Sequence, residues 1–179
     1  LEFRRVLFRS AVREASATQL DGVTASGNFT LLSGGAITDA GAISVTGKGT
    51  YTAGTGASIT LNDTNNYGSF AASGVNITLI EASATDLSTV TATGTLNVTS
   101  SGAITDSGLV TATTSTTLSA GGNAITLDVA NSKYGPLAFT GSNVSLVNTG
   151  ALDLAASSAS GTLTIAAKSL TDSGNLAIT

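Results

Sequence analysis

The chain has 179 residues and a formal net charge of −4, with aromatic residues at 4%, charged residues at 10% and no Cys, Met, Trp or His. Beyond the first ten residues, four basic residues face ten acidic ones (4 − 10 = −6), which excludes a basic surface for nucleic acid or anionic lipid. No apolar run reaches the roughly 20 residues of a membrane span, and a chain without Cys has no disulfides. Hydrophobic residues reach 41%, which is too many for a disordered tract and favours one packed, β-rich domain.

The first segment, LEFRRVLFRS, differs from everything after it. It holds two of the five Phe and three of the four Arg. It lacks the apolar run of about 7 to 15 residues and the small-residue cleavage site of a signal peptide. One back-translation of the segment resembles a short-read sequencing adapter. We therefore expect residues 1–10 to be non-native and residues 11–179 to form the protein proper.

Residues 11–179 consist of a long sequence repeat. GAITDAG at 35–41 returns as GAITDSG at 102–108, a shift in numbering of 67 (102 − 35), and SLTDSG follows at 169–174. A long period of this kind is typical of stacked repeat architectures. The units are a partial one at 11–34, full ones at 35–101 and 102–167, and a partial one at 168–179.

Short strands follow one another through each unit. Each carries two aliphatic residues on either side of one small polar residue, and Gly, Asn or Asp recurs about every eight residues. No segment shows a helical period, so the pattern predicts an all-β fold. The aliphatic pairs are, in chain order, Ile43 and Val45, Ile59 and Leu61, Ile77 and Leu79, Leu96 and Val98, Ile125 and Leu127, Val144 and Leu146, and Leu163 and Ile165.

A repeat rich in small residues favours a β-solenoid, in which each coil stacks on the one before, because sandwiches rarely repeat their sequence. We predict a right-handed parallel β-helix, with a β-sandwich as the alternative. With coils of roughly 20 to 25 residues, one 67-residue unit would make about three coils. The body would then be a rod of about seven or eight coils, on the order of 35 Å long.

The unit resembles a known family. GAITDSG, an AITL strand, an Asn-rich turn that ends in Tyr, an NVSL strand, ALDL and GTLTI are together similar to the β-strand repeats of filamentous-haemagglutinin-like surface proteins of Gram-negative bacteria. The resemblance covers residues 11–179. It implies a structural stalk of a large adhesin, secreted to the outer cell surface, often by two-partner secretion. The implied partners are host or neighbouring-cell receptors or glycans and adjacent repeats of the same chain, without nucleic acid, membrane insertion or cofactor.

The recurring aspartates Asp39, Asp106 and Asp172 are the first candidate site. If a unit makes three coils, they stand about 14 Å apart along the rod, whereas the two carboxylates of a glycosidase lie roughly 5 to 9.5 Å apart. Their Thr-Asp-Ser/Ala-Gly context is typical of an Asx turn, in which the carboxylate accepts backbone N–H groups and Gly adopts a positive φ. We therefore expect turn residues and no catalytic role.

Two Asn-rich segments offer oxygen atoms for Ca²⁺. Because Ca²⁺ takes about six to eight oxygens, including several carboxylates, a turn is the favoured interpretation of both segments and no metal site is expected. Each segment precedes a tyrosine that is expected to cap the turn, with stacking on a sugar ring as the alternative. The segments comprise Asn62, Asp63, Asn65 and Asn66 before Tyr67, and Asp128, Asn131 and Ser132 before Tyr134.

Hydroxyl groups are abundant, but nucleophilic catalysis lacks a His or Cys, and GTGAS at 54–58 lacks the Lys of a phosphate-binding loop. Alternate threonines at 88–95 and 112–118, Thr114 and Thr116 among them, leave an ice- or glycan-binding face as the alternative function. Repeat-equivalent positions vary among Thr, Ser, Asn and Ala, which favours an ordinary solvated strand face. The sequence thus predicts a structural protein and no enzyme.

Overall fold

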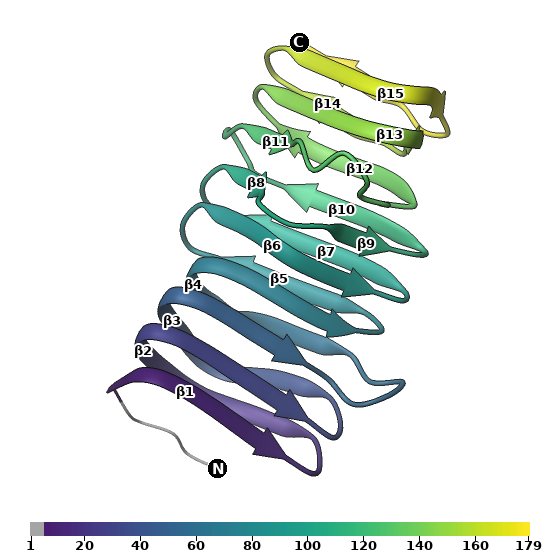
Figure 1. The fold of residues 1–179 in the computed structure, drawn as a ribbon. Helices are drawn as coiled ribbons and strands as arrows, with labels where there is room; N and C mark the ends of the chain where they lie inside the picture. Colours follow the sequence, from purple (N-terminus) through teal and green to yellow (C-terminus); the bar gives the residue numbers. More distant parts are fainter. Residues whose placement is uncertain (1–5) are drawn as a thin grey trace.

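The computed structural model describes residues 6–179, and side chains from residue 11, as a rod of stacked strands with the first and the last described strand at opposite ends (Figure 1). None of the described residues forms a helix that could cross a membrane. The strands are β1 (Val6–Glu14), β2 (Thr18–Ser33), β3 (Ile37–Thr52), β4 (Ile59–Gly74), β5 (Ile77–Glu81), β6 (Thr85–Ala92), β7 (Thr95–Ser100), β8 (Ile104–Asp106), β9 (Val110–Ala112), β10 (Ser115–Ser119), β11 (Ile125–Leu127), β12 (Pro136–Gly141), β13 (Val144–Leu154), β14 (Ser157–Ala159), β15 (Leu163–Asp172) and β16 (Leu176–Ile178).

The segment predicted to be non-native falls partly outside this description. Residues 1–5 lie outside the described residues, and residues 6–10 begin β1, which pairs with β2. A parallel ladder uses backbone N–H and C=O groups, so this pairing is independent of the side chains. The origin of residues 1–10 stays a prediction.

All pairings between the described strands are parallel, which confirms the predicted β-solenoid and excludes the β-sandwich. The hand of the coil stays a prediction. One ladder passes through almost the whole chain with one residue per turn. Its members are Thr18, Ile37, Ile59, Ile77, Leu96, Thr116, Leu137, Leu154 and Asp172.

The turns are shorter and more numerous than predicted. The eight steps of this ladder cover 154 residues (172 − 18), which gives about 19 residues per turn, about nine turns, and a rod roughly 43 Å long. The coils are short because their corners are tight. Only residues 82–84 connect β5 to β6, and only residues 93–94 connect β6 to β7.

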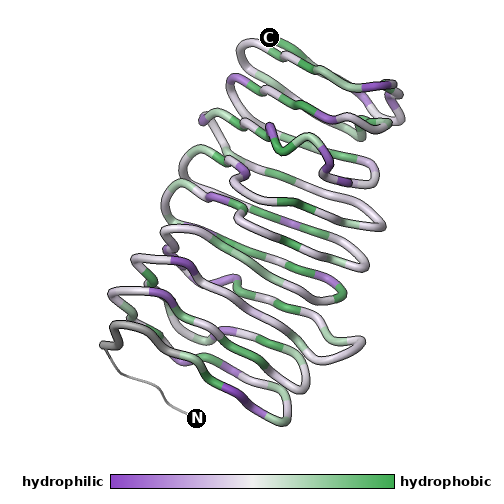
Figure 2. Tube along the Cα trace, viewed as in Figure 1, coloured by the Kyte–Doolittle hydropathy of each residue, from purple (hydrophilic) through white to green (hydrophobic). Residues whose placement is uncertain are grey.

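The aliphatic pairs identified in the sequence form the core. Those from Ile43 to Leu146 are at most 1% exposed, and Leu163 and Ile165, near the C-terminal end, are partly buried. Figure 2 shows hydrophobic residues spaced along each turn between more polar ones, as expected of strands with one inner face. Each buried Val, Leu or Ile contributes roughly 1.5 to 3 kcal/mol, so the interior holds the stack together.

The 67-residue unit makes about three and a half turns (67/19), which corrects the prediction of three. Ile37, Ile59, Ile77 and Leu96 stack in one ladder, whereas their equivalents Ile104, Ile125, Val144 and Leu163 stack in another that starts at Thr85. Thr85 lies between Ile77 and Leu96 in the chain, halfway around the turn. Repeat-equivalent residues therefore lie on opposite sides of the rod, and its two faces carry related sequences.

Candidate functional site

The aspartates singled out in the sequence do not form turns of their own. Asp39 lies within β3 and Asp106 ends β8; they are 8% and 7% exposed, and both occupy inward positions. Leu20 pairs with Asp39 and Leu87 with Asp106, so each carboxylate replaces an aliphatic side chain of its stack. Asp172, at the end of β15, is exposed.

These aspartates are not brought together. Asp39 and Asp106 lie on opposite sides of the rod, about 17 Å apart along its axis at three and a half turns. Neither can share a substrate or an ion with the other. We expected Asp39 and Asp106 to be three coils apart on one face of the rod. They are instead three and a half turns apart on opposite sides, which also places them too far apart for a glycosidase pair.

Each buried carboxylate accepts backbone N–H groups from the next turn. Asp39 accepts the N–H of Asn62 (2.9 Å) and of Asp63 (3.2 Å). The pairing of β3 with β4 stops after Thr38 and Thr60 and resumes at Ser44 and Asn66. Asp39 therefore accepts hydrogen bonds from backbone N–H groups that have no partner strand at this interruption. An orphaned buried N–H is costly, which explains a carboxylate in this aliphatic stack.

Asp106 repeats this arrangement in the second unit. Its carboxylate accepts the N–H of Asp128 (2.7 Å) and of Val129 (3.4 Å) and the hydroxyl of Tyr134 (3.4 Å). Burial raises the pKa of Asp106 above its usual value, and the two N–H groups oppose that rise. Of the three aspartates, only Asp172 accepts a local bond, from the N–H of Gly174 (3.3 Å). The predicted role as a backbone acceptor is right for all three, but the predicted Asx turn is wrong for the two buried ones.

The glycines that follow Asp39 and Asp106 allow neighbouring turns to pack closely. Neither Gly41 nor Gly108 has a positive φ, which corrects the sequence prediction. A Cβ on Gly41 would lie 2.9 Å from the backbone nitrogen of Gly22, and a Cβ on Gly108 would overlap the carbonyl oxygen of Ser88. The absence of a side chain therefore lets the preceding turn approach.

A second inward polar position follows in each unit. Asn65, which is fully buried, donates from Nδ2 to Asp39 (2.7 Å) and accepts the N–H of Ile43 (2.9 Å). Its equivalent, Ser132, is 2% exposed and accepts the N–H of Val110 (3.1 Å). In each unit, the buried side chain at this position therefore accepts a backbone N–H from the preceding turn.

The oxygens of the proposed Ca²⁺ segments diverge. In the first unit Asn62 and Asn66 are exposed on the continuous strand β4, whereas Asn65 points inward. A strand directs successive side chains to opposite faces, so these oxygens cannot surround one ion. The predicted turn is wrong for this segment and right for the second, where residues 128–135 form a loop between β11 and β12. No group of three or more acidic side chains placed to hold a metal occurs among the described residues.

The third polar position is Glu81 in one unit and Asn148 in the next. Glu81 is 1% exposed; its Oε1 accepts the N–H of Tyr67 (2.9 Å), and its Oε2 has no hydrogen-bond partner within the described part of the chain. Burial raises the pKa of Glu81 to about 7, against the opposing effect of the Tyr67 N–H. Asn148 instead donates to the carbonyl of Ser132 (2.8 Å) and accepts the N–H of Gly150 (2.7 Å).

Aromatic rings fill the rod beside Glu81. Tyr51 stacks on Phe70 with ring centroids 5.7 Å apart and meets the edge of Tyr67 at 5.8 Å. Burial raises the pKa of both tyrosines, which keeps them neutral. Tyr67 and Tyr134 are each 3% exposed, so stacking on a sugar ring, left open by the sequence, is wrong for both.

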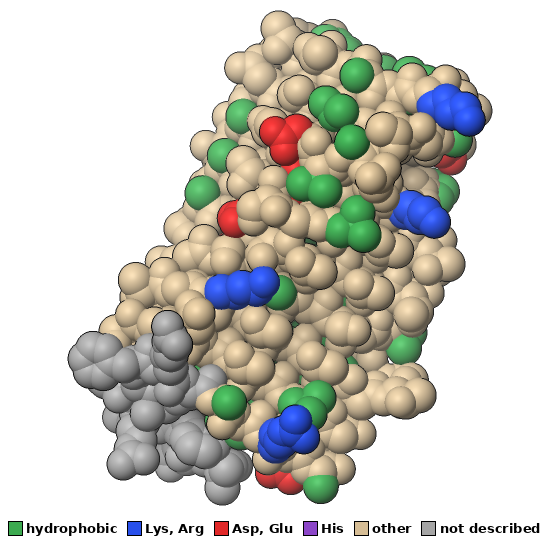
Figure 3. All heavy atoms as spheres, in the orientation of Figure 1, with side chains coloured by type: hydrophobic (Ala, Val, Ile, Leu, Met, Phe, Trp, Pro, Cys, Tyr) green, Lys and Arg blue, Asp and Glu red, His purple; other side chains and the backbone are tan. Residues whose placement is uncertain are grey.

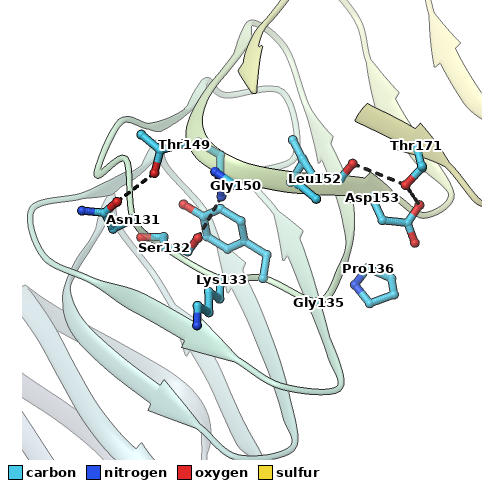
Figure 4. A pocket seen from close by; sticks show the side chains of 13 residues that line it. Asn131, Ser132, Lys133, Gly135, Pro136, Thr149, Gly150, Leu152, Asp153 and Thr171 are labelled. Carbon is cyan, nitrogen blue, oxygen red and sulfur yellow. Dashed lines mark hydrogen bonds between the residues drawn. The ribbon is translucent and has the colours of Figure 1, made fainter. Parts of the chain in front are cut away.

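A groove of about 610 Å³ opens beside the loop of residues 128–135 (Figure 4). At one end Thr149 donates to Asn131 (2.8 Å), and at the other Thr171 donates to Asp153 (3.0 Å). Lys133 also lines it. The complete lining is Asn131, Ser132, Lys133, Tyr134, Gly135, Pro136, Asn148, Thr149, Gly150, Ala151, Leu152, Asp153 and Thr171.

One comparison with known proteins identifies a family. A family described as "Repeats of unknown function (DUF5649)" matches residues 9–73, 74–140 and 141–179. The chain belongs to this family. No curated protein and no solved structure matches it.

The DUF5649 matches begin at positions 9, 74 and 141, a spacing close to the period seen in the sequence. Each full DUF5649 match therefore covers about three and a half turns of this rod. Successive matches begin on opposite sides of it. The family description carries no activity, so the site must be interpreted from its own chemistry.

Sequence reasoning missed the groove of the DUF5649 chain. Tyr134 comes seven positions after Leu127, whereas the equivalent Tyr67 comes six positions after Leu61. The second unit thus has one more residue here than the first. In the first unit this segment is part of strand β4, whereas in the second it is the loop of residues 128–135. Indels are tolerated in loops, which also carry binding sites.

The threonine-rich segments of the DUF5649 chain divide between core and surface. Thr116 is 1% exposed and donates to the carbonyl of Tyr134 (2.7 Å), so it belongs to the interior. Thr114 is exposed. The outward column of one ladder reads Thr38, Thr60, Thr78, Asn97, Thr117 and Ala138, a mixed surface.

Proposed function

We propose that residues 11–179 are a stalk segment of a large secreted adhesin of the filamentous-haemagglutinin-like type, with no catalytic role. The segment extends from the outer surface of a Gram-negative cell and separates a binding tip from it. The observation that carries this proposal is the single parallel ladder from Thr18 to Asp172, in which each turn adds about 4.8 Å of length. The inner polar positions Asp39, Asn65 and Asp106 support it, because their side chains bind backbone groups of neighbouring turns.

The surface also suits a stalk. Charged side chains are few and scattered on the face shown in Figure 3, which leaves mostly hydroxyl, amide and backbone atoms toward solvent. Such a surface gives little electrostatic attraction for nucleic acid or anionic membranes. We infer that contacts with receptors are made elsewhere in the parent protein or weakly along the rod.

Electron microscopy tests the stalk. Proteins with one and two tandem copies of residues 11–179 should appear as unbranched rods, the second about twice as long as the first. A globular particle, or a tandem protein that folds into two separate bodies at an angle, would contradict it. Deletion of the segment from the parent protein should shorten the reach of surface-displayed tips without abolishing receptor binding at the tip.

Glycan binding is a second candidate function, favoured by the groove. Lys133, Asp153 and Thr171 offer donors and acceptors along an open hollow with Leu152 as its buried floor. A glycan array should give signal that falls at least tenfold in Lys133→Ala and Asp153→Asn. Asp86→Asn is the matched control, because Asp86 is the repeat equivalent of Asp153 and lies outside the groove. Array signal that survives both groove variants would reject this site.

A further inference from the structure

Two hollows of the rod are joined by one column of outward residues. The first is the groove of about 610 Å³ beside the loop of residues 128–135, and the second, of about 330 Å³, lies over β3, β4 and β6. Parallel pairing connects them with one residue per turn. The first three members of this hydroxyl column line the second hollow and the last lines the groove. The column is Thr52, Ser73, Thr91, Thr111 and Lys133.

The hydroxyl groups of the column are available to a ligand. All five residues of the column are exposed or half-buried. Other outward hydroxyls of the rod are bonded to neighbouring side chains, as Thr149 is to Asn131. In contrast, no side-chain hydrogen bond within the described part of the chain is made by Thr52, Ser73, Thr91 or Thr111.

A lysine lies at each end of this surface. Lys48 lines the second hollow, on β3 four residues before Thr52 and therefore on the same outward face, and Lys133 ends the column. Neither ammonium group forms an ion pair with any described residue. Four turns separate Thr52 from Lys133, so the two cations lie about 19 Å apart along the axis. The column between them contains no acidic residue.

We propose that this face binds an acidic polysaccharide whose chain runs along the rod axis. Its carboxylate groups lie on Lys48 and Lys133, and its hydroxyl groups lie on the column between them. Thr and Ser hydroxyls suit sugar hydroxyls because each can both donate and accept a hydrogen bond. The two lysines supply the opposite charge to the carboxylates. This proposal rests on the glycan-binding candidate function, to which it adds the charge of the ligand and a second contact region.

Other anionic partners fit this face less well. Nucleic acid or an anionic membrane binds a broadly basic surface, whereas beyond the first ten residues the chain has a net charge of −6 (4 − 10). An acidic peptide offers carboxylates but few hydroxyl groups for the column. A sugar chain supplies hydroxyl groups at each turn of the rod and carboxylates at both ends of the column.

Isothermal titration calorimetry with oligogalacturonates tests the proposal. The octasaccharide should bind, and its methyl ester, which keeps the ring hydroxyls but carries no charge, should bind at least tenfold more weakly. A galacturonate disaccharide is too short to reach both lysines, so it loses the gain from two linked contacts and should also bind at least tenfold more weakly. Lys48→Ala and Lys133→Ala should each weaken octasaccharide binding at least threefold.

Thr91→Asp places a negative charge in the middle of the column and should weaken octasaccharide binding at least tenfold. Thr78→Asp is the matched control, because it adds the same charge at a half-buried outward position outside the column, next to Ile77 in the ladder that starts at Thr18. It should leave binding within twofold of the unchanged chain. Circular dichroism of each variant checks that the fold is kept.

Several results would overturn the proposal. These are equal binding of the acid and its methyl ester, equal effects of Thr91→Asp and Thr78→Asp, an unchanged affinity in Lys48→Ala, or an octaglutamate peptide that binds as tightly as the octasaccharide. If the methyl ester binds and only Lys133→Ala weakens it, this proposal fails and glycan binding in the groove stands. If no oligosaccharide binds, both glycan proposals fail and the stalk function stands.

Discussion

Replacing Gly108 with Ala is expected to destabilise the rod by at least about 3 kcal/mol. The new Cβ would overlap the carbonyl oxygen of Ser88, and neither atom can rotate away, because the backbone fixes the positions of both. The two turns would have to separate, with loss of the hydrogen bond from the Gly108 N–H to the Leu87 carbonyl (3.2 Å). Overpacking of flexible side chains costs roughly 1 to 3 kcal/mol, and a rigid backbone contact is expected to reach the upper end or exceed it. Urea unfolding followed by circular dichroism measures the change.

Gly122→Ala is the control for this prediction. Apart from Gly122 and its two neighbours in the chain, no heavy atom of the described residues lies within 4 Å of a Cβ at Gly122, and its φ is not positive. The substitution should leave the free energy of unfolding within about 0.5 kcal/mol of the unchanged chain. Equal effects of the two substitutions would show that the close approach of turns at Gly108 is not a constraint on the fold.

Glu81→Gln is expected to stabilise the protein at pH 8 and to remove a pH dependence. The pKa of Glu81 is raised to about 7 in the folded chain, from an ordinary value of 4.5. Between these values the folded state binds more protons than the unfolded state, so stability is full below about pH 4.5 and falls as pH rises through about 7. A shift of this size corresponds to a loss of about 3 kcal/mol. Gln keeps an acceptor for the Tyr67 N–H and carries no charge at any pH.

Urea unfolding at pH 5, 6, 7 and 8 gives the measurement. The unchanged chain should lose stability across the series, and Glu81→Gln should be nearly flat and the more stable of the two at pH 8. Glu14→Gln is the matched control, because Glu14 holds the same repeat position in the first turn but is only half-buried. The free energy of unfolding of Glu14→Gln should change with pH in the same way as that of the unchanged chain. A variant that is less stable than the unchanged chain at pH 8 would contradict the prediction, because it would mean that the folded state favours the ionised form of Glu81.

The core could be predicted from the sequence because alternation identifies inward residues locally. Ile59 and Leu61, or Val144 and Leu146, need only their own strand to be recognised, and each is buried. The number of turns per unit was missed because a long period does not itself reveal how many coils it contains. The signal was present: Ile59, Ile77 and Leu96 recur at the spacing of one turn, and that spacing fits three and a half times into the period.

The inner polar positions could not be predicted in the same way. Asp39 precedes Ala and Gly, a context that favours a turn, and its partner Asn65 lies 26 residues away on the next coil. Only the stacking of turns brings the two together, and the sequence alone does not give that register. Glu81 is a further case, because nothing in its neighbours in the sequence indicates that its side chain is buried and accepts the N–H of Tyr67.

The central claim is that one repeat makes three and a half turns and places its equivalents on opposite faces. Distance measurement between paired spin labels tests it directly, because the chain has no native Cys and introduced ones are unique. Thr38 and Thr117 belong to one ladder, four turns apart, so labels on Thr38→Cys and Thr117→Cys should be separated by about 19 Å. Labels on Thr38→Cys and Thr105→Cys, which are repeat equivalents, should lie farther apart, because about 17 Å along the axis adds to the width of the rod. A separation of about 14 Å for this second pair, on the same face, would contradict the half-turn and restore a three-coil repeat.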